Sequence, residues 1–157
     1  MKFPSSAQRM LRNPFRIVSA SVVCFTLVGG ALQAQSAAFV VGNDRGGIVG
    51  DRAAEIRRLK SAGRRVEIRG RICLSSCTMY LGAGDVCVDP ETRFGFHGPS
   101  YYGQPLAPQH FEYWSEVIAD HYPKPLKDWF MSTARYRMNG YHTIKGAELI
   151  RLGTPEC

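Results

Sequence analysis

Acidic residues are absent from the first 43 positions of this chain, where all the charged side chains are basic: Lys2, Arg9, Arg12 and Arg16. An apolar stretch, 17–34, follows and ends in Leu32-Gln33-Ala34. This order is typical of a secretory signal peptide, with the small residues as the cleavage site. We therefore expect residues 1–34 to be a signal peptide, with an uncleaved N-terminal anchor as the alternative.

Positive charge is in only small excess once this predicted leader is left out. The whole chain carries a net charge of +7, and subtracting the four basic residues of the leader leaves +3. A local basic run remains at Arg57, Arg58, Lys60, Arg64, Arg65, Arg69 and Arg71. Because no aromatic residue interrupts this run, it indicates a solvated surface rather than a nucleic-acid site. We expect no nucleic-acid partner, and membrane contact only through an uncleaved leader.

Internal repeats, low-complexity tracts and a Gly-Lys-Ser/Thr phosphate loop are also absent from the sequence. The mature chain of about 120 residues is long enough for one compact domain with a modest core. We place this domain at residues 38–157 of an exported protein, either periplasmic or secreted.

Four cysteines remain after the leader: Cys73, Cys77, Cys87 and Cys157. An even number in an exported chain favours two disulfides. Three pairings are open, and we favour Cys73 with Cys77 across a turn and Cys87 with Cys157 at the tail. A zinc site with His97 is the alternative, although Cys-x3-Cys-x9-Cys is not a common zinc pattern.

The chain is organised around residues 66–97. Alternating apolar residues predict a strand from Val66 to Ile72, and the segment 78–81, followed by glycines, predicts a short helix. A second strand, broken at Asp89-Pro90, is predicted from Val86 to Phe96.

The flanking segments extend this pattern. Upstream, a short strand at 38–41, a glycine-rich turn at 42–47 and a helix at 49–62 form a strand–helix–strand unit. Downstream, helices are predicted at 108–121, 126–136 and 146–152. The predicted fold is α/β, with helices around a mostly parallel sheet. Since ligands gather at the carboxyl ends of parallel strands, Gly47 and Ser75 are expected to approach each other there.

Four motifs in order resemble those of the Clp-protease/crotonase superfamily, in particular its small exported bacterial members. They are Asn43-Asp44-Arg45-Gly46-Gly47, Cys73-Leu74-Ser75-Ser76-Cys77, Phe94-Gly95-Phe96-His97-Gly98-Pro99 and Gly146-Ala147-Glu148-Leu149-Ile150-Arg151-Leu152-Gly153. The resemblance covers about residues 38–153. It implies a single domain built from repeated ββα and βαβ units around the sheet.

The resemblance implies that Ser75 is a nucleophile and His97 its general base. Backbone N–H groups of Ser76 and of Gly46 or Gly47 would form the oxyanion hole.

The sequence departs from the family pattern in two places. Arg45 replaces a proline of the oxyanion turn, and no acid lies near Arg137, where the family has its third catalytic residue. Asn139 is the nearest group that could orient His97, and Asp128 or Asp120 are alternatives.

These observations predict a serine hydrolase that acts on a peptide or another acyl substrate. The missing acid favours a second hypothesis, a catalytically inactive binding module of the same fold. Neither hypothesis requires a cofactor or a metal. The helix at 108–121 occupies the place through which larger relatives of this fold assemble, so we also expect a homo-oligomer that buries Trp114.

Overall fold

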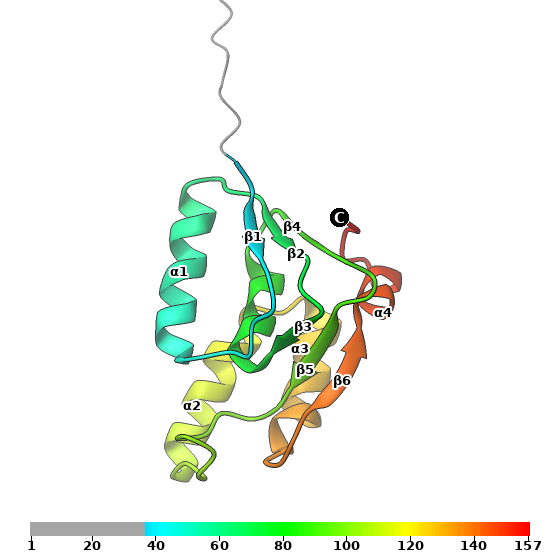
Figure 1. Cartoon of the computed structure of the whole chain (residues 1–157). Coiled ribbons are helices and arrows are strands. Elements are labelled where there is room, and N and C mark those ends of the chain that lie inside the picture. Colours follow the sequence, from blue (N-terminus) through cyan, green and yellow to red (C-terminus); the bar gives the residue numbers. More distant parts are fainter. Residues whose placement is uncertain (1–36) are drawn as a thin grey trace, which may run out of the picture. The chain divides into compact units, whose positions relative to one another are not determined.

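The computed structural model describes residues 37–157, so the predicted leader at 1–34 lies outside the described residues. The described residues belong to one compact unit. Within residues 37–157 the fold is mixed α/β, with two three-stranded sheets and four α-helices (Figure 1). The α/β class predicted from the strand and helix patterns is confirmed.

The strands are divided between two small sheets. The first contains parallel strands in the order β1 (Phe39–Val41), β2 (Val66–Ile68) and β4 (Val86–Val88). The second has the order β3 (Ile72–Leu74), β5 (Arg93–Phe96) and β6 (His142–Lys145). In this second sheet β3 and β5 are parallel, whereas β6 is antiparallel to β5.

The single strand predicted from Val66 to Ile72 is wrong, because the chain leaves one sheet after β2 and enters the other as β3. At the change of direction, Gly70 lies so close to Gly42 that an added Cβ would collide with the Gly42 carbonyl. The predicted break at Asp89-Pro90 likewise separates β4 from β5. Both long segments therefore contribute one strand to each sheet.

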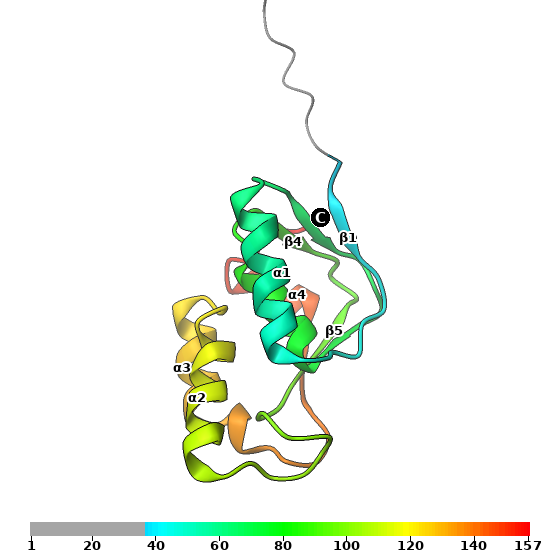
Figure 2. The ribbon, with the colours of Figure 1, turned by 90° about the vertical axis from the view of Figure 1, so that its left-hand side faces the viewer.

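The first helix, α1 (Val49–Ser61), lies beside the first sheet (Figures 1 and 2). It buries Ala53, Ile56 and Leu59, which recur at intervals of three and so share one face. Its predicted end at Gly63 is close to the observed one, and Gly63 has a φ of +58°. The short helix after β3 is the 3₁₀ helix η1 (Ser75–Gly82), whose side chains are almost all buried.

The second half of the chain adds α2 (Pro108–Ala119), α3 (Lys124–Ser132), the 3₁₀ turn η2 (Ala134–Tyr136) and α4 (Gly146–Arg151). Figure 2 shows α2 and α3 side by side, and the two helices contact each other. Both α2 and α3 have proline in the first turn, where its missing N–H removes no helical hydrogen bond. The helix predicted over 126–136 is thus divided into α3 and η2.

Two disulfides are present, Cys73–Cys77 and Cys87–Cys157, as favoured from the sequence. The second joins β4 to the last residue, and backbone hydrogen bonds from Val88 to Pro155 and from Cys157 to Val88 reinforce this connection. Such bonds indicate an oxidising environment. Within the part of the chain that the structure describes, no helix has both the length and the apolarity of a membrane span.

Candidate active site

Ser75 and His97 form the centre of the candidate site. The Nε2 atom of His97 lies 2.8 Å from the hydroxyl oxygen of Ser75. Ser75 directly follows β3 and His97 directly follows β5, and these neighbouring strands are parallel with Leu74 opposite Gly95. The carboxyl ends of both strands therefore lie at one edge of the sheet, which brings the two side chains together.

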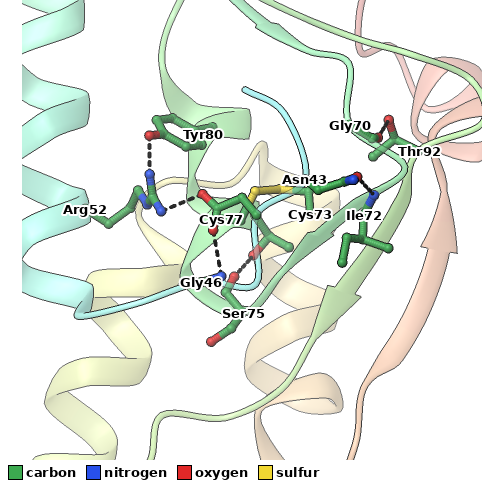
Figure 3. Close-up of a disulfide and its surroundings, with 12 residues drawn as sticks. Asn43, Gly46, Arg52, Gly70, Ile72, Cys73, Ser75, Cys77, Tyr80 and Thr92 are labelled. Carbon is green, nitrogen blue, oxygen red and sulfur yellow. Dashed lines mark hydrogen bonds and ion pairs between the residues drawn. A yellow bond between two sulfur atoms is a disulfide. The ribbon is translucent and has the colours of Figure 1, made fainter. Parts of the chain in front are cut away.

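The backbone at Ser75 has an unusual conformation. Its φ is +56°, in the left-handed region that residues other than glycine rarely adopt, at a cost on the order of 1–3 kcal/mol. The Cys73–Cys77 disulfide closes a five-residue ring around this serine. Figure 3 shows Ser75 within the segment that this bond spans. The turn thus directs the Ser75 hydroxyl toward His97 and into the pocket described below.

The glycine-rich turn after β1 contacts Ser75 directly. Gly46 has a φ of +94°, and a Cβ added there would lie 2.6 Å from the Cβ of Ser75, so only glycine fits. Asp44 connects this turn to β3, because its N–H donates to Ile72 and its carbonyl accepts from Leu74. The turn therefore lies close to the serine through Gly46, whereas the prediction had named Gly47.

One of the predicted oxyanion donors is already in use. The N–H of Gly46 donates to a carboxylate oxygen of Asp44 at 2.7 Å, so it is not free to bind a substrate oxyanion. Within residues 37–157, no acceptor is found for the N–H groups of Gly47 and Ser76. The Ser76 hydroxyl donates to the Gly47 carbonyl at 3.1 Å and links the segments that carry these two donors.

His97 is partly buried, and this burial lowers its pKa below the usual value, with a hydrogen bond that the imidazole donates to the Gly98 backbone as a partial offset. The imidazole is therefore neutral at neutral pH and able to accept the serine proton. The ring of Tyr141 packs edge-on against the imidazole, with centroids 5.2 Å apart. Since neither a carboxylate nor an amide orients this histidine within the described residues, Gly98 and Tyr141 hold it instead.

The predicted third members of the site lie elsewhere. Asp128 is on the exposed surface of α3, where its carboxylate pairs with Lys124 at 2.7 Å. Asp120 is similarly engaged with Lys127, and Asn139 is exposed in the turn before β6. None of the three is hydrogen-bonded to His97, so the expectation that one of them orients the imidazole is wrong.

Residues 135–137 pack against the chain just after His97 through their backbone. A Cβ on Gly98 would collide with the Arg135 carbonyl, and the N–H of Gly98 donates to the Arg137 carbonyl at 3.3 Å. The Arg135 side chain is buried and pairs with Glu112 at 2.6 Å. The segment around Arg137, where the third catalytic residue was expected, thus contacts Gly98 through backbone carbonyl groups.

A cavity of about 480 Å³ opens beside the Ser75 hydroxyl. Its apolar walls come from the start of α1, from the loop after His97 and from α2, and they include Ile48, Val49, Leu106, Trp114 and Ile118. Tyr101, Tyr102 and Tyr122 add aromatic surface. Among the lining side chains, His97 is the one that can carry charge near neutral pH, so the cavity suits an apolar group.

A cluster of polar side chains beside the glycine-rich turn (residues 42–47) was not predicted. Arg52 of α1 pairs with Asp44 and Glu55, at 2.6 and 2.9 Å, and its guanidinium lies over the ring of Tyr80. Nothing in the sequence distinguishes Arg52 from the neighbouring arginines of the same helix. The helical spacing from Arg52 to Glu55 was the one available indication of the pair.

All four cysteines of residues 37–157 take part in the two disulfides, so they offer no thiolate for a metal. Within the described residues, no group of three or more potential side-chain ligands is found. Comparison of the chain with models of protein families, with curated proteins and with solved structures finds no match.

Proposed function

We propose that this protein is an exported serine hydrolase with a Clp/crotonase-like architecture, acting on a peptide or another acyl substrate. The contact of 2.8 Å between the Ser75 hydroxyl and His97 Nε2 carries this proposal. A serine hydroxyl is a weak nucleophile until an adjacent base accepts its proton. A neutral histidine at this distance supplies that base.

In the proposed reaction, His97 accepts the proton from Ser75 as the serine oxygen attacks the substrate carbonyl. The N–H groups of Gly47 and Ser76 stabilise the oxyanion that develops. His97 then donates the proton to the leaving group, and water hydrolyses the acyl-Ser75 intermediate by the reverse sequence. A backbone group orients the imidazole less favourably than a carboxylate would, so we expect slow turnover.

We expect the Ser75→Ala and His97→Ala variants to lose covalent labelling by a fluorophosphonate, because each removes one half of the nucleophile–base pair. The measurement is the rate of labelling of the oxidised mature protein, with the modified residue identified by mass spectrometry. Ser132→Ala and His110→Ala are matched controls, since both side chains are exposed and neither lines the cavity beside Ser75. Labelling that persists in Ser75→Ala, or that is absent from the wild type, would contradict the proposal.

The apolar cavity predicts which substituent the substrate presents. Gly50 lies at the start of α1, and a Cβ added there would meet the Trp114 ring at 3.7 Å, an ordinary contact. We therefore expect Gly50→Ala to be tolerated and Gly50→Leu to fill part of the cavity. Labelling by a long-chain alkyl fluorophosphonate should fall about tenfold in Gly50→Leu, which corresponds to roughly 1.4 kcal/mol.

A methyl fluorophosphonate, which does not need the cavity, should label Gly50→Leu at the wild-type rate. If the labelling rate of Gly50→Leu falls equally with both probes, the substitution disturbs Ser75 itself. If Gly50→Leu keeps the wild-type labelling rate with both probes, the cavity does not take part in substrate recognition.

The second candidate function is a binding module that holds an apolar ligand without turnover. The observation that favours it is the lack of a carboxylate beside His97 within residues 37–157. It predicts saturable binding of a hydrophobic peptide that survives Ser75→Ala, in a wild type that no fluorophosphonate labels.

A further inference from the structure

The polar cluster of Asp44, Arg52, Glu55 and Tyr80 connects the glycine-rich turn with α1 and with η1, the helix that begins at Ser75. We propose that Arg52 is a positioning residue, which holds the Asp44 carboxylate and through it the N–H of Gly47 in the direction needed to bind an oxyanion. This inference rests on the proposed hydrolase function and adds a residue to its machinery.

Asp44 is the junction of this arrangement. Its backbone bridges the strand that leads to the nucleophile, with its N–H donating to Ile72 at 3.1 Å and its carbonyl accepting from Leu74 at 2.9 Å. One carboxylate oxygen accepts the Gly46 N–H at 2.7 Å, and the other accepts from Arg52 at 2.6 Å. Both carboxylate oxygens of Asp44 therefore have a defined partner.

Arg52 in turn is fixed from α1 and from η1. Its second terminal nitrogen donates to Glu55 at 2.9 Å and to the Tyr80 hydroxyl, and its guanidinium carbon lies 4.3 Å from the Tyr80 ring centre. Burial and the hydrogen bond to Glu55 raise the pKa of Tyr80, so the phenol keeps its proton and donates to Glu55 at 2.6 Å. Because η1 begins with Ser75, the cluster joins the oxyanion turn to the helix of the nucleophile.

These contacts determine which backbone N–H group of the turn is left to bind an oxyanion. Asp44 holds the Gly46 N–H, so the next peptide unit presents the Gly47 N–H instead, and Gly46 already touches Ser75. Without the guanidinium, the Asp44 carboxylate is free to rotate, and the peptide between Gly46 and Gly47 can rotate with it. The side chain of Arg52 is 13% exposed, so water replaces this interaction poorly.

The test is the kinetics of fluorophosphonate labelling in Arg52→Met, Arg52→Lys and Asp44→Ala. The oxyanion donors act on the pentavalent transition state of labelling rather than on initial binding. We therefore expect the maximal labelling rate to fall roughly tenfold in Arg52→Met, less than the loss of a whole donor costs, while the probe concentration at half-maximal rate stays unchanged. Arg52→Lys should recover part of the rate, and Asp44→Ala should match or exceed the loss in Arg52→Met.

A second readout reports the turn itself. Hydrogen exchange of the Gly46 amide, measured by NMR, should accelerate in Arg52→Met because its acceptor is no longer held. Arg65→Met is the matched control, since it removes an exposed ion pair with Asp85 elsewhere on the surface and should alter neither the labelling nor the Gly46 exchange. Arg52→Lys keeps the test valid if Arg52→Met does not fold.

The outcomes separate this inference from the function on which it rests. A labelled wild type together with an unchanged maximal rate in Arg52→Met overturns the positioning role and leaves the hydrolase proposal intact. A change confined to the half-maximal probe concentration also overturns it, because Arg52 would then act in binding. A wild type that no fluorophosphonate labels overturns both.

Discussion

Removal of the Cys73–Cys77 disulfide is expected to reduce labelling of Ser75 by at least about 100-fold while the protein remains folded. The bond encloses a serine whose φ of +56° is unfavourable for any residue except glycine. Once the ring is open, the backbone relaxes toward an ordinary conformation and the hydroxyl moves away from His97. A misplacement of about 1 Å between reacting groups is sufficient for a loss of this size.

The cost in stability should be small by comparison. In the chain-entropy model a ring of five residues contributes only about 2 kcal/mol to the free energy of unfolding. The measurement pairs the labelling rate of Cys73→Ala/Cys77→Ala with its unfolding in guanidinium. A folded double variant that labels at the wild-type rate would show that packing alone maintains the turn.

Removal of the Cys87–Cys157 disulfide is expected to lower the stability of the fold strongly and to leave the labelling of Ser75 unchanged. The two residues are 70 positions apart, so this bond closes a long loop and contributes about 4 kcal/mol in the same model. The loop contains β5, α2, α3, β6 and α4, which is most of the second half of the domain. For a domain of this size the melting temperature should fall by roughly 15 °C.

The site itself does not include these two cysteines. At a temperature where Cys87→Ala/Cys157→Ala is still folded, labelling of Ser75 should therefore proceed at the wild-type rate. Each double variant is the control for the other, because both remove one pair of disulfide-bonded cysteines. A loss of stability below about 1 kcal/mol would contradict this estimate and would indicate that the unfolded chain gains little freedom when the bond is removed.

The parts of the fold that could be predicted depend on local patterns. The helix after the glycine-rich turn follows from apolar residues at intervals of three, and its end follows from Gly63. The division of β2 from β3 depends on the contact of Gly70 with Gly42, which are far apart in the chain. The strand β6 was missed because its four residues alternate weakly and acquire their conformation only by pairing with β5.

The candidate site also has features that could be predicted from the sequence and features that could not. The pairing of Ser75 with His97 was expected from the family resemblance, and the structure brings the two residues together because the parallel strands β3 and β5 end at the same edge of the sheet. Which N–H groups remain free could not be predicted, since it depends on the direction of the Asp44 carboxylate. The contact of the Gly98 backbone with Arg135 is also set by tertiary packing, in a segment where the sequence led us to seek a side chain.

The short ring around the nucleophile also has a consequence for the timing of activity. If Ser75 acquires its reactive conformation only when Cys73 and Cys77 are joined, the newly made chain is latent in a reducing compartment. Oxidation after the proposed export would then play the part that propeptide cleavage plays in a zymogen. The protein would be unable to cleave its substrates until it had left the reducing compartment in which it is made.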